Sequence, residues 1–177
     1  MQTYRSRSSQ IWGWIAVGLG AAMALASVAV PDVARASVGV GLGVALAASG
    51  VAIYLRPSIG IGADAVELRN VMTTVTVPFA RLDSIETRWT LELVGDDGKR
   101  VGSMGAPTKS SRQRHAEKAK GEVPETVEVV KAAWDAWRRA GGTAAPAQGP
   151  AFTRRADPAG IAWVAAATAG AIVGLFL

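Results

Sequence analysis

In residues 38–62, VGVGLGVALAASGVAIYLRPSIGIG, a charge-free helical pattern gives way to a strand pattern. Residues 38–55 exceed the minimum of about 17 apolar residues that a helix needs to cross a hydrocarbon core. Arg56 and Pro57 end this run, because a charge is costly in lipid and proline interrupts a helix. The stretch therefore predicts a membrane helix that leads directly into a β domain.

Two further segments, residues 11–30 and 159–177, are also free of charged side chains and long enough to span a membrane. The 19 basic and 14 acidic residues all lie outside these three segments. Aromatic side chains favour the membrane–water interface, and four of them lie near segment ends: Trp12, Trp14, Tyr54 and Trp163. The sequence predicts three transmembrane helices.

The basic residues that flank these segments predict the orientation of the chain. Arg5 and Arg7 precede the first segment, Arg56 follows the second, and Arg154 and Arg155 precede the third. Cytoplasmic flanks carry the excess of Lys and Arg. We therefore expect a multi-pass protein of the cell (plasma) membrane, with the amino terminus and central domain in the cytoplasm and the carboxyl terminus outside.

A cleaved signal peptide is the alternative interpretation of the first segment. Arg5 and Arg7 would form its basic region, and residues 34–36, Ala-Arg-Ala, resemble a cleavage site. The apolar run over 11–30 is longer than an ordinary signal core, which favours a membrane helix.

Residues 56–141 read as a small antiparallel β domain closed by one carboxy-terminal helix. Proline at position 124 and Gly-Gly at 141–142 bound the helix, and its apolar positions fall on one face. We expect that face to cover the sheet, with partner binding as the alternative. Short alternating runs predict the strands at 58–62, 66–69, 72–77, 82–86, 89–94 and 100–104. The helix face consists of Val127, Val130, Trp134 and Trp137.

Residues 142–158 are rich in Pro, Gly and Ala and predict a flexible linker. Its length would let the third membrane helix stand apart from the first two. The predicted fold class is therefore an α+β membrane protein with three transmembrane helices and one small soluble domain.

Several short motifs resemble a known family. They are YLRP at 54–57, DAVELRN at 64–70, VPFARLDSI at 77–85 and WTLEL at 89–93. The stretch 10–105 is similar to the bacterial PH-domain membrane proteins common in actinobacteria. That resemblance implies a PH-like fold without an established enzymatic activity. The chain departs from the family pattern in Phe79, where tryptophan is usual, and in its third membrane segment.

The residues offer little from which to build an active site. The chain has no cysteine, and its one histidine, His115, lies in a polar stretch. Walker-type loops, zinc-ligand spacings and Ser/His/Asp sets are absent from the sequence, and no ionisable residue lies inside an apolar segment. We expect no enzyme, no transporter, no cofactor, no metal and no small-molecule substrate. The modest charge excess and the lack of a basic aromatic face also argue against nucleic acid.

One basic segment, residues 109–120, carries five cations against one anion. It can be a solvated loop, a contact for anionic lipids of the cytoplasmic leaflet, or a contact for an acidic protein. The candidate contact residues are Lys109, Arg112, Arg114, Lys118 and Lys120.

Small residues recur every four positions in two membrane segments, which allows close approach of helices. The candidate packing residues are Gly39, Gly43, Ala166, Gly170 and Gly174. Their partner can be another segment of this chain or another protein, and the pattern can also follow from the abundance of Ala and Gly.

The first functional hypothesis is a non-enzymatic membrane-anchored interaction module, an accessory or scaffold subunit of a larger membrane complex. Its partners would be membrane lipids and other membrane subunits. The alternative is an anionic-lipid-binding module of the membrane surface that uses the 109–120 segment.

Overall fold

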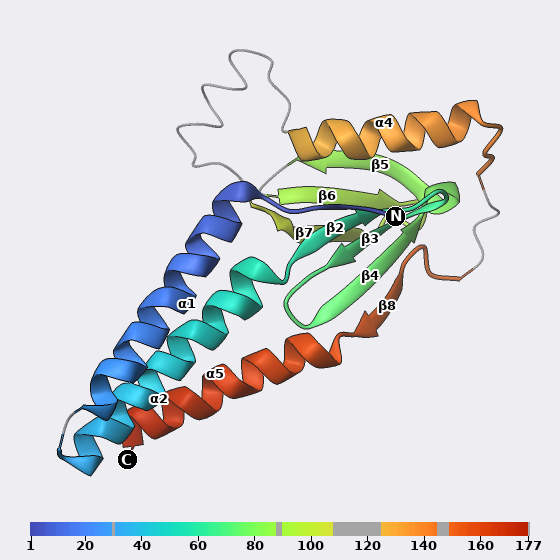
Figure 1. Ribbon diagram of the computed structural model, residues 1–177. Coiled ribbons are helices and arrows are strands. Elements are labelled where there is room, and N and C mark those ends of the chain that lie inside the picture. Colours follow the sequence, from blue (N-terminus) through green and yellow to red (C-terminus); the bar gives the residue numbers. More distant parts are fainter. Residues whose placement is uncertain (30, 88–89, 108–124, 145–148, 177) are drawn as a thin grey trace.

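The computed structural model describes residues 1–29, 31–87, 90–107, 125–144 and 149–176. It is an α+β fold in which three apolar helices extend from a pair of antiparallel sheets (Figure 1). These helices are α1 (Arg7–Val28), α2 (Val33–Gly50) and α5 (Pro158–Phe176). Length and composition qualify all three as membrane spans, which associates the protein with a membrane.

The first two helices begin earlier than predicted, because polar residues cap them. Ser6 caps α1 by accepting a hydrogen bond from the Ser9 amide. Asp32 caps α2 by accepting a hydrogen bond from the Ala34 amide at 3.0 Å, so residues 33–37, which lie between the first two predicted segments, are helical. The second helix continues through a π-helical segment, η1 (Val51–Leu55), in which the Arg56 amide donates to the carbonyl of Val51.

One sheet has five strands in the order β1-β2-β3-β4-β8, and every neighbouring pair is antiparallel. The other has three strands in the order β5-β6-β7. A 3₁₀ turn, η2 (Phe79–Arg81), connects the two sheets. The strands of the first sheet are β1 (Gln2–Tyr4), β2 (Ser58–Ile61), β3 (Ala65–Arg69), β4 (Thr73–Pro78) and β8 (Thr153–Ala156). Those of the second are β5 (Leu82–Thr87), β6 (Thr90–Gly95) and β7 (Arg100–Pro107).

The core lies between the sheets and under helix α4 (Glu125–Arg139). Val127 and Val130 on α4 are almost fully buried, and the Trp134 indole N–H donates to the Phe79 carbonyl at 3.3 Å. Trp137 packs its ring against that of Phe79, with the ring centroids 6.1 Å apart. The apolar face of this helix therefore covers the core, as the sequence predicted, and a partner-binding role for that face is not needed.

Two of the described strands, β1 and β8, were not predicted from the sequence. Strand β8 lies within 142–158, so the prediction of a flexible linker is wrong at 153–156. The open edge of β4 offers unpaired backbone groups, and β8 satisfies them through pairs such as Thr76 with Thr153. The third helix does not stand apart either, because α5 packs along α2 (Figure 1).

All three helices join the five-stranded sheet at the same end. Tyr4 at the end of β1 pairs with Ile59 at the start of β2, just beyond η1. On the opposite edge Ala156 pairs with Thr73, and α5 begins two residues later. Both edge strands of this sheet therefore lead directly into apolar helices, which fixes the sheet relative to these helices.

Candidate functional site

A buried carboxylate connects the third helix to the rest of the molecule. Asp157 is 8% exposed, and its Oδ2 accepts a hydrogen bond from Nη2 of Arg56 at 2.7 Å. Its Oδ1 accepts from the Gly160 amide, which caps the first turn of α5. Its own amide donates to the Met72 carbonyl at 2.8 Å. One residue thus ties together the end of the second helix, the β3–β4 turn and the start of the third helix.

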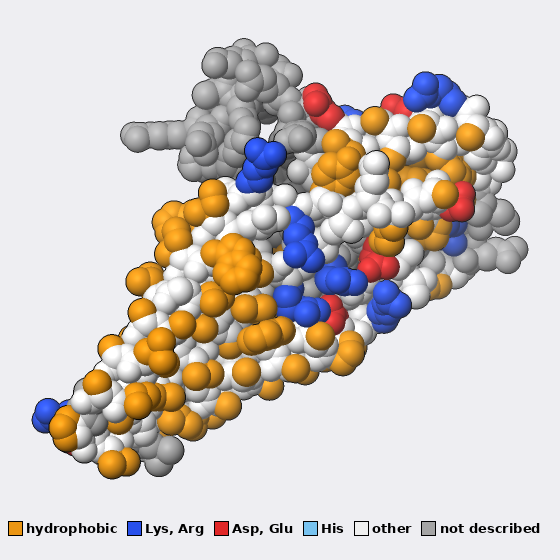
Figure 2. Space-filling model, in the orientation of Figure 1, with side chains coloured by type: hydrophobic (Ala, Val, Ile, Leu, Met, Phe, Trp, Pro, Cys, Tyr) orange, Lys and Arg blue, Asp and Glu red, His pale blue; other side chains and the backbone are white. Residues whose placement is uncertain are grey.

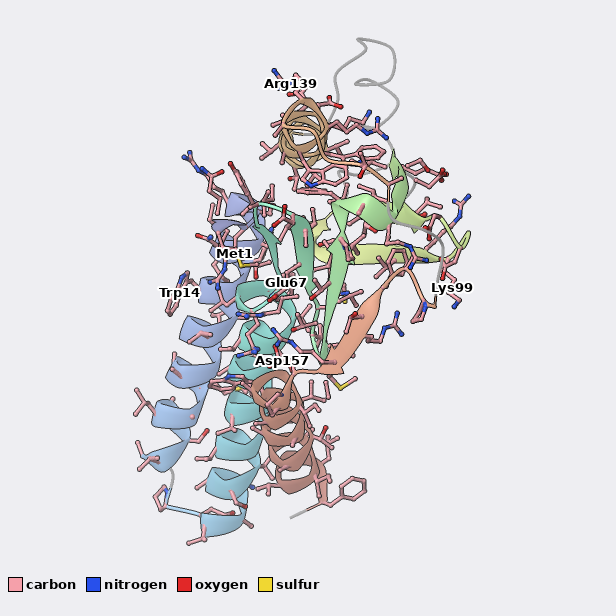
Figure 3. The ribbon with its side chains drawn as sticks, turned by 90° about the vertical axis from the view of Figure 1, so that its right-hand side faces the viewer. Met1, Trp14, Glu67, Lys99, Arg139 and Asp157 are labelled. Atoms are coloured by element: carbon pink, nitrogen blue, oxygen red, sulfur yellow. The ribbon has the colours of Figure 1, made fainter. Side chains whose placement is uncertain are left out.

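Two arginines and a glutamate of the sheet extend this arrangement. Nε of Arg69 lies 3.9 Å from Oδ2 of Asp157, and Nη2 of Arg69 lies 3.6 Å from Oε1 of Glu67. Nη2 of Arg155 donates to Oε2 of Glu67 at 3.4 Å. Figure 3 shows Asp157 at the start of α5 with Glu67 above it on the sheet. The group of Arg56, Glu67, Arg69, Arg155 and Asp157 is called the junction cluster below.

The junction cluster is charged at neutral pH. Burial alone would raise the pKa of Asp157, but the Gly160 amide and the guanidinium groups of Arg56 and Arg69 outweigh it and lower that pKa below its ordinary value. The carboxylate is therefore an anion at neutral pH. Three cations surround two anions, which leaves the cluster with a net positive charge.

A second polar network holds the segment that leads to β8. Nε and Nη2 of Arg81 donate to the two carboxylate oxygens of Asp96, and Nη2 also donates to the Gly149 carbonyl at 3.1 Å. Asp97 accepts from the Ala151 amide at 3.2 Å. This and a second backbone hydrogen bond lower the pKa of Asp97, although burial opposes them. The network is structural, since it fixes the chain ahead of β8.

Glycines allow α1 and α2 to pack at backbone contact. A methyl group added at Gly43 would lie 2.5 Å from the Gly20 carbonyl oxygen, and one at Gly50 would lie 2.7 Å from Cβ of Ala16. A methyl group at Gly39 would collide with the Ser27 side chain. The stripe predicted in the second helix thus faces the first helix of the same chain.

The stripe predicted in the third helix faces the second. A methyl group added at Gly170 would lie 2.7 Å from the Gly41 carbonyl oxygen, and one at Gly174 would lie 2.7 Å from Cγ of Leu42. Ala166 is partly buried along the same helix. Gly41 was missed, because it lies two residues from each glycine of the predicted stripe and serves the opposite helix pair.

The predicted basic contact segment lies outside the described residues, which omit 108–124. Its members Lys109, Arg112, Arg114, Lys118 and Lys120 therefore stay predictions. Within the described part of the chain, no three His, Cys, Asp or Glu residues are grouped as metal ligands.

Comparison with known proteins does not place the chain in a family. No family model, no curated protein and no solved structure matches it. The resemblance to bacterial PH-domain proteins is therefore a prediction from the motifs alone.

The sequence predicted no cluster of these residues. Arg56 and Arg155 were interpreted as basic flanks of apolar segments, and Asp157 was assigned to the linker. The available signal was Asp157 itself, because an acidic residue directly before an apolar helix needs a cationic partner once it is buried.

Proposed function

We propose that this protein is a non-enzymatic, membrane-anchored interaction module, an accessory or scaffold subunit of a larger membrane complex. The observation that carries the proposal is the joining of three apolar helices to one sheet through both of its edge strands. Such a joint holds the soluble domain in one orientation relative to the helices. A fixed orientation serves a subunit that must present one surface to its partners.

The outward faces of the helices are the proposed docking surfaces. The small-residue stripes are used within the chain, so what remains outward is aliphatic and aromatic. On α1 the exposed fractions reach 60% for Leu19 and 74% for Leu25, and next to Gly18 there is open space. Lipid or a neighbouring subunit would cover this face (Figure 2).

We further propose that the soluble domain is PH-like and cytoplasmic. Two antiparallel sheets followed by one helix over the core support the fold. The orientation rests on the basic flanks, and cysteine labelling in intact cells tests it because the chain has no native cysteine. Arg35→Cys should react with an impermeant maleimide from outside, and Lys99→Cys should react only after lysis. The reverse pattern would disprove the orientation.

Affinity purification from the native membrane in a mild detergent tests the scaffold role. The expected result is one membrane protein recovered at constant stoichiometry, with its amount reduced when Leu19→Trp and Leu25→Trp enlarge the outer face of α1. The matched control is Ile172→Trp on the outer face of α5. Recovery of the chain alone, or of companions in varying ratios, would disprove the proposal.

An anionic-lipid-binding module remains the second candidate function. The sequence predicts that such a module would bind lipid through the 109–120 segment. Flotation of the full chain with anionic vesicles tests this, with the five cations of that segment replaced by glutamine. Unchanged flotation would reject binding through that segment. The net positive charge of the junction cluster favours anionic-lipid binding at that cluster, in place of the 109–120 segment.

A further inference from the structure

Two arginines of the junction cluster share one row across the five-stranded sheet. Arg69 on β3 pairs with Thr74 on β4, and Thr74 pairs with Arg155 on β8. Paired residues project from the same face, and neighbouring strands lie about 4.8 Å apart. The two arginine Cα atoms are therefore about 10 Å apart, a span that two long side chains can close around one small anion.

The hydrogen-bonding capacity of this row is largely unused. A guanidinium group has five N–H donors. The contacts of Arg69 with Glu67 and Asp157, at 3.6 and 3.9 Å, are ion pairs longer than hydrogen bonds. Arg155 donates one hydrogen bond, at 3.4 Å. Their side chains are 41% and 66% exposed, so the terminal guanidinium nitrogens can be reached from outside, whereas Nε of Arg69 is buried beside Asp157 without a hydrogen-bond partner.

The row lies at the level where the apolar helices end. Asp157, which faces Arg69, is the last residue before α5, and Arg56 directly follows η1. Tyr54 and Trp163, 42% and 40% exposed, stand on the apolar side of this boundary, as interfacial aromatic residues do. Figure 2 shows blue cationic side chains gathered where the apolar helices meet the sheets. Lipid phosphates occupy this level in a bilayer.

We propose that Arg69 and Arg155 form a binding site for the phosphate of an anionic phospholipid headgroup. Arg56 positions the site by holding Asp157. Glu67 and Asp157 orient the two guanidinium groups. The three cations exceed the two carboxylates by one charge, which leaves positive charge for one bound phosphate. The ligand is a lipid and not a soluble phosphate, because apolar helices inside a bilayer would place the site at the level of the headgroups. This site goes beyond the scaffold role and does not depend on it.

The test uses the full chain purified in phosphatidylcholine-containing micelles and titrated with phosphatidylglycerol. Native mass spectrometry then gives the dissociation constant of the first bound anionic lipid. A basic residue near a membrane surface contributes about fivefold in affinity, so Arg69→Gln with Arg155→Gln should weaken binding about 30-fold. Binding weakened less than threefold would overturn the proposal.

The matched control is Arg100→Gln with Arg139→Gln. It removes the same charge from exposed arginines of β7 and α4, away from the three apolar helices (Figure 3 labels Arg139). It should change the dissociation constant less than twofold. An equal loss in control and test variants would mean general charge attraction and would overturn the site. Replacing the five cations of 109–120 should leave the dissociation constant of the first bound lipid unchanged. If that variant loses the first lipid while Arg69→Gln with Arg155→Gln retains it, the proposed site is overturned.

Two further arms keep the test decisive. If the double variant does not fold, Arg155→Gln alone should weaken binding about fivefold, because this side chain is the more exposed. Titration with glycerol 3-phosphate in place of the lipid should give no saturable binding below millimolar concentration. Tight binding of that soluble headgroup analogue would assign the site to a soluble phosphate and overturn the lipid assignment.

Discussion

Nη2 of Arg56 and Oδ2 of Asp157 lie 2.7 Å apart, although the two residues are separated by 101 positions in the chain. Arg56 ends the second apolar helix and Asp157 precedes the third. The pair closes the helix bundle on its domain side. Both side chains are largely buried, with 19% and 10% of their surfaces exposed. Breaking such a pair from one side leaves an uncompensated charge, which makes the contact testable.

Replacing the carboxylate should destabilise the fold. Asp157→Asn leaves Arg56 without its anion and should lower the free energy of unfolding by about 2 kcal/mol, less than for a fully buried pair because water reaches part of it. Thermal unfolding in detergent, followed by tryptophan fluorescence, measures the loss. Glu86→Gln is the control, since its pair with Arg100 is exposed and should contribute under about 1 kcal/mol. Equal losses in both variants would contradict the assignment.

The contribution of Asp157 should depend on pH below about 4. Burial opposes ionisation, but the Gly160 amide and the guanidinium groups of Arg56 and Arg69 lower the pKa of Asp157 in the folded state below its ordinary 3.8. The folded state then holds this proton less readily than the unfolded state. The stabilisation is complete above about pH 5, declines as the pH falls past the unfolded value of 3.8, and is lost once the pH falls through the lower folded value.

Melting temperatures of the wild type and Asp157→Asn between pH 7 and pH 3 check this dependence. The difference between the two proteins should be constant from pH 7 to about 5 and should shrink below about 4. Other carboxylates titrate in both proteins and cancel in the difference. A difference in melting temperature that stays constant down to pH 3 would show that Asp157 does not titrate as described.

Enlarging a glycine between the first two helices should loosen the bundle. Gly43→Val forces atoms against the Gly20 carbonyl and Cβ of Ala24, at 2.5 and 2.9 Å, and should cost about 1–3 kcal/mol. Gly18→Val is the control because no atom lies within 4 Å of its added carbon. Unfolding in mild detergent with increasing dodecyl sulfate measures both variants. Equal sensitivity would argue against this helix contact.

A disulfide should form across the unexpected strand pair. Thr76→Cys and Thr153→Cys are directly opposite in β4 and β8, within the distance range of a disulfide. Oxidation of this double variant should produce a reducible shift in gel mobility, undisturbed by other thiols because the native chain has none. Thr76→Cys with Thr143→Cys should not react. The opposite outcome would mean that residues 153–156 are not paired with β4.

The sequence predicted most of this architecture because its strongest patterns are local. Charge-free runs identified all three apolar helices, and short alternating runs identified six strands. Strands β1 and β8 have no such pattern, since Gln2–Tyr4 and Thr153–Ala156 are short, largely exposed edge strands. Their pairing is decided by the open edges of β2 and β4, which only the folded sheet reveals.

The junction cluster was missed for a related reason. Its residues lie at positions 56, 67, 69, 155 and 157, and nothing local indicates that the two ends of this range meet. Pairing of β8 brings Arg155 beside Glu67, and α5 then begins next to Arg56. A signal that depends on a contact between distant segments cannot be read from spacing.

The closure of β4 by β8 has a consequence for biosynthesis. While the ribosome is still making the residues before position 153, the first two helices and the strands from β2 to β7 are already present, but the edge of β4 is open. An open edge invites pairing with other nascent chains. Strand β8 seals that edge, and the third apolar helix begins two residues after it. Completion of the sheet therefore waits until nearly the whole chain has been made, and the edge of β4 is the surface that needs protection until then.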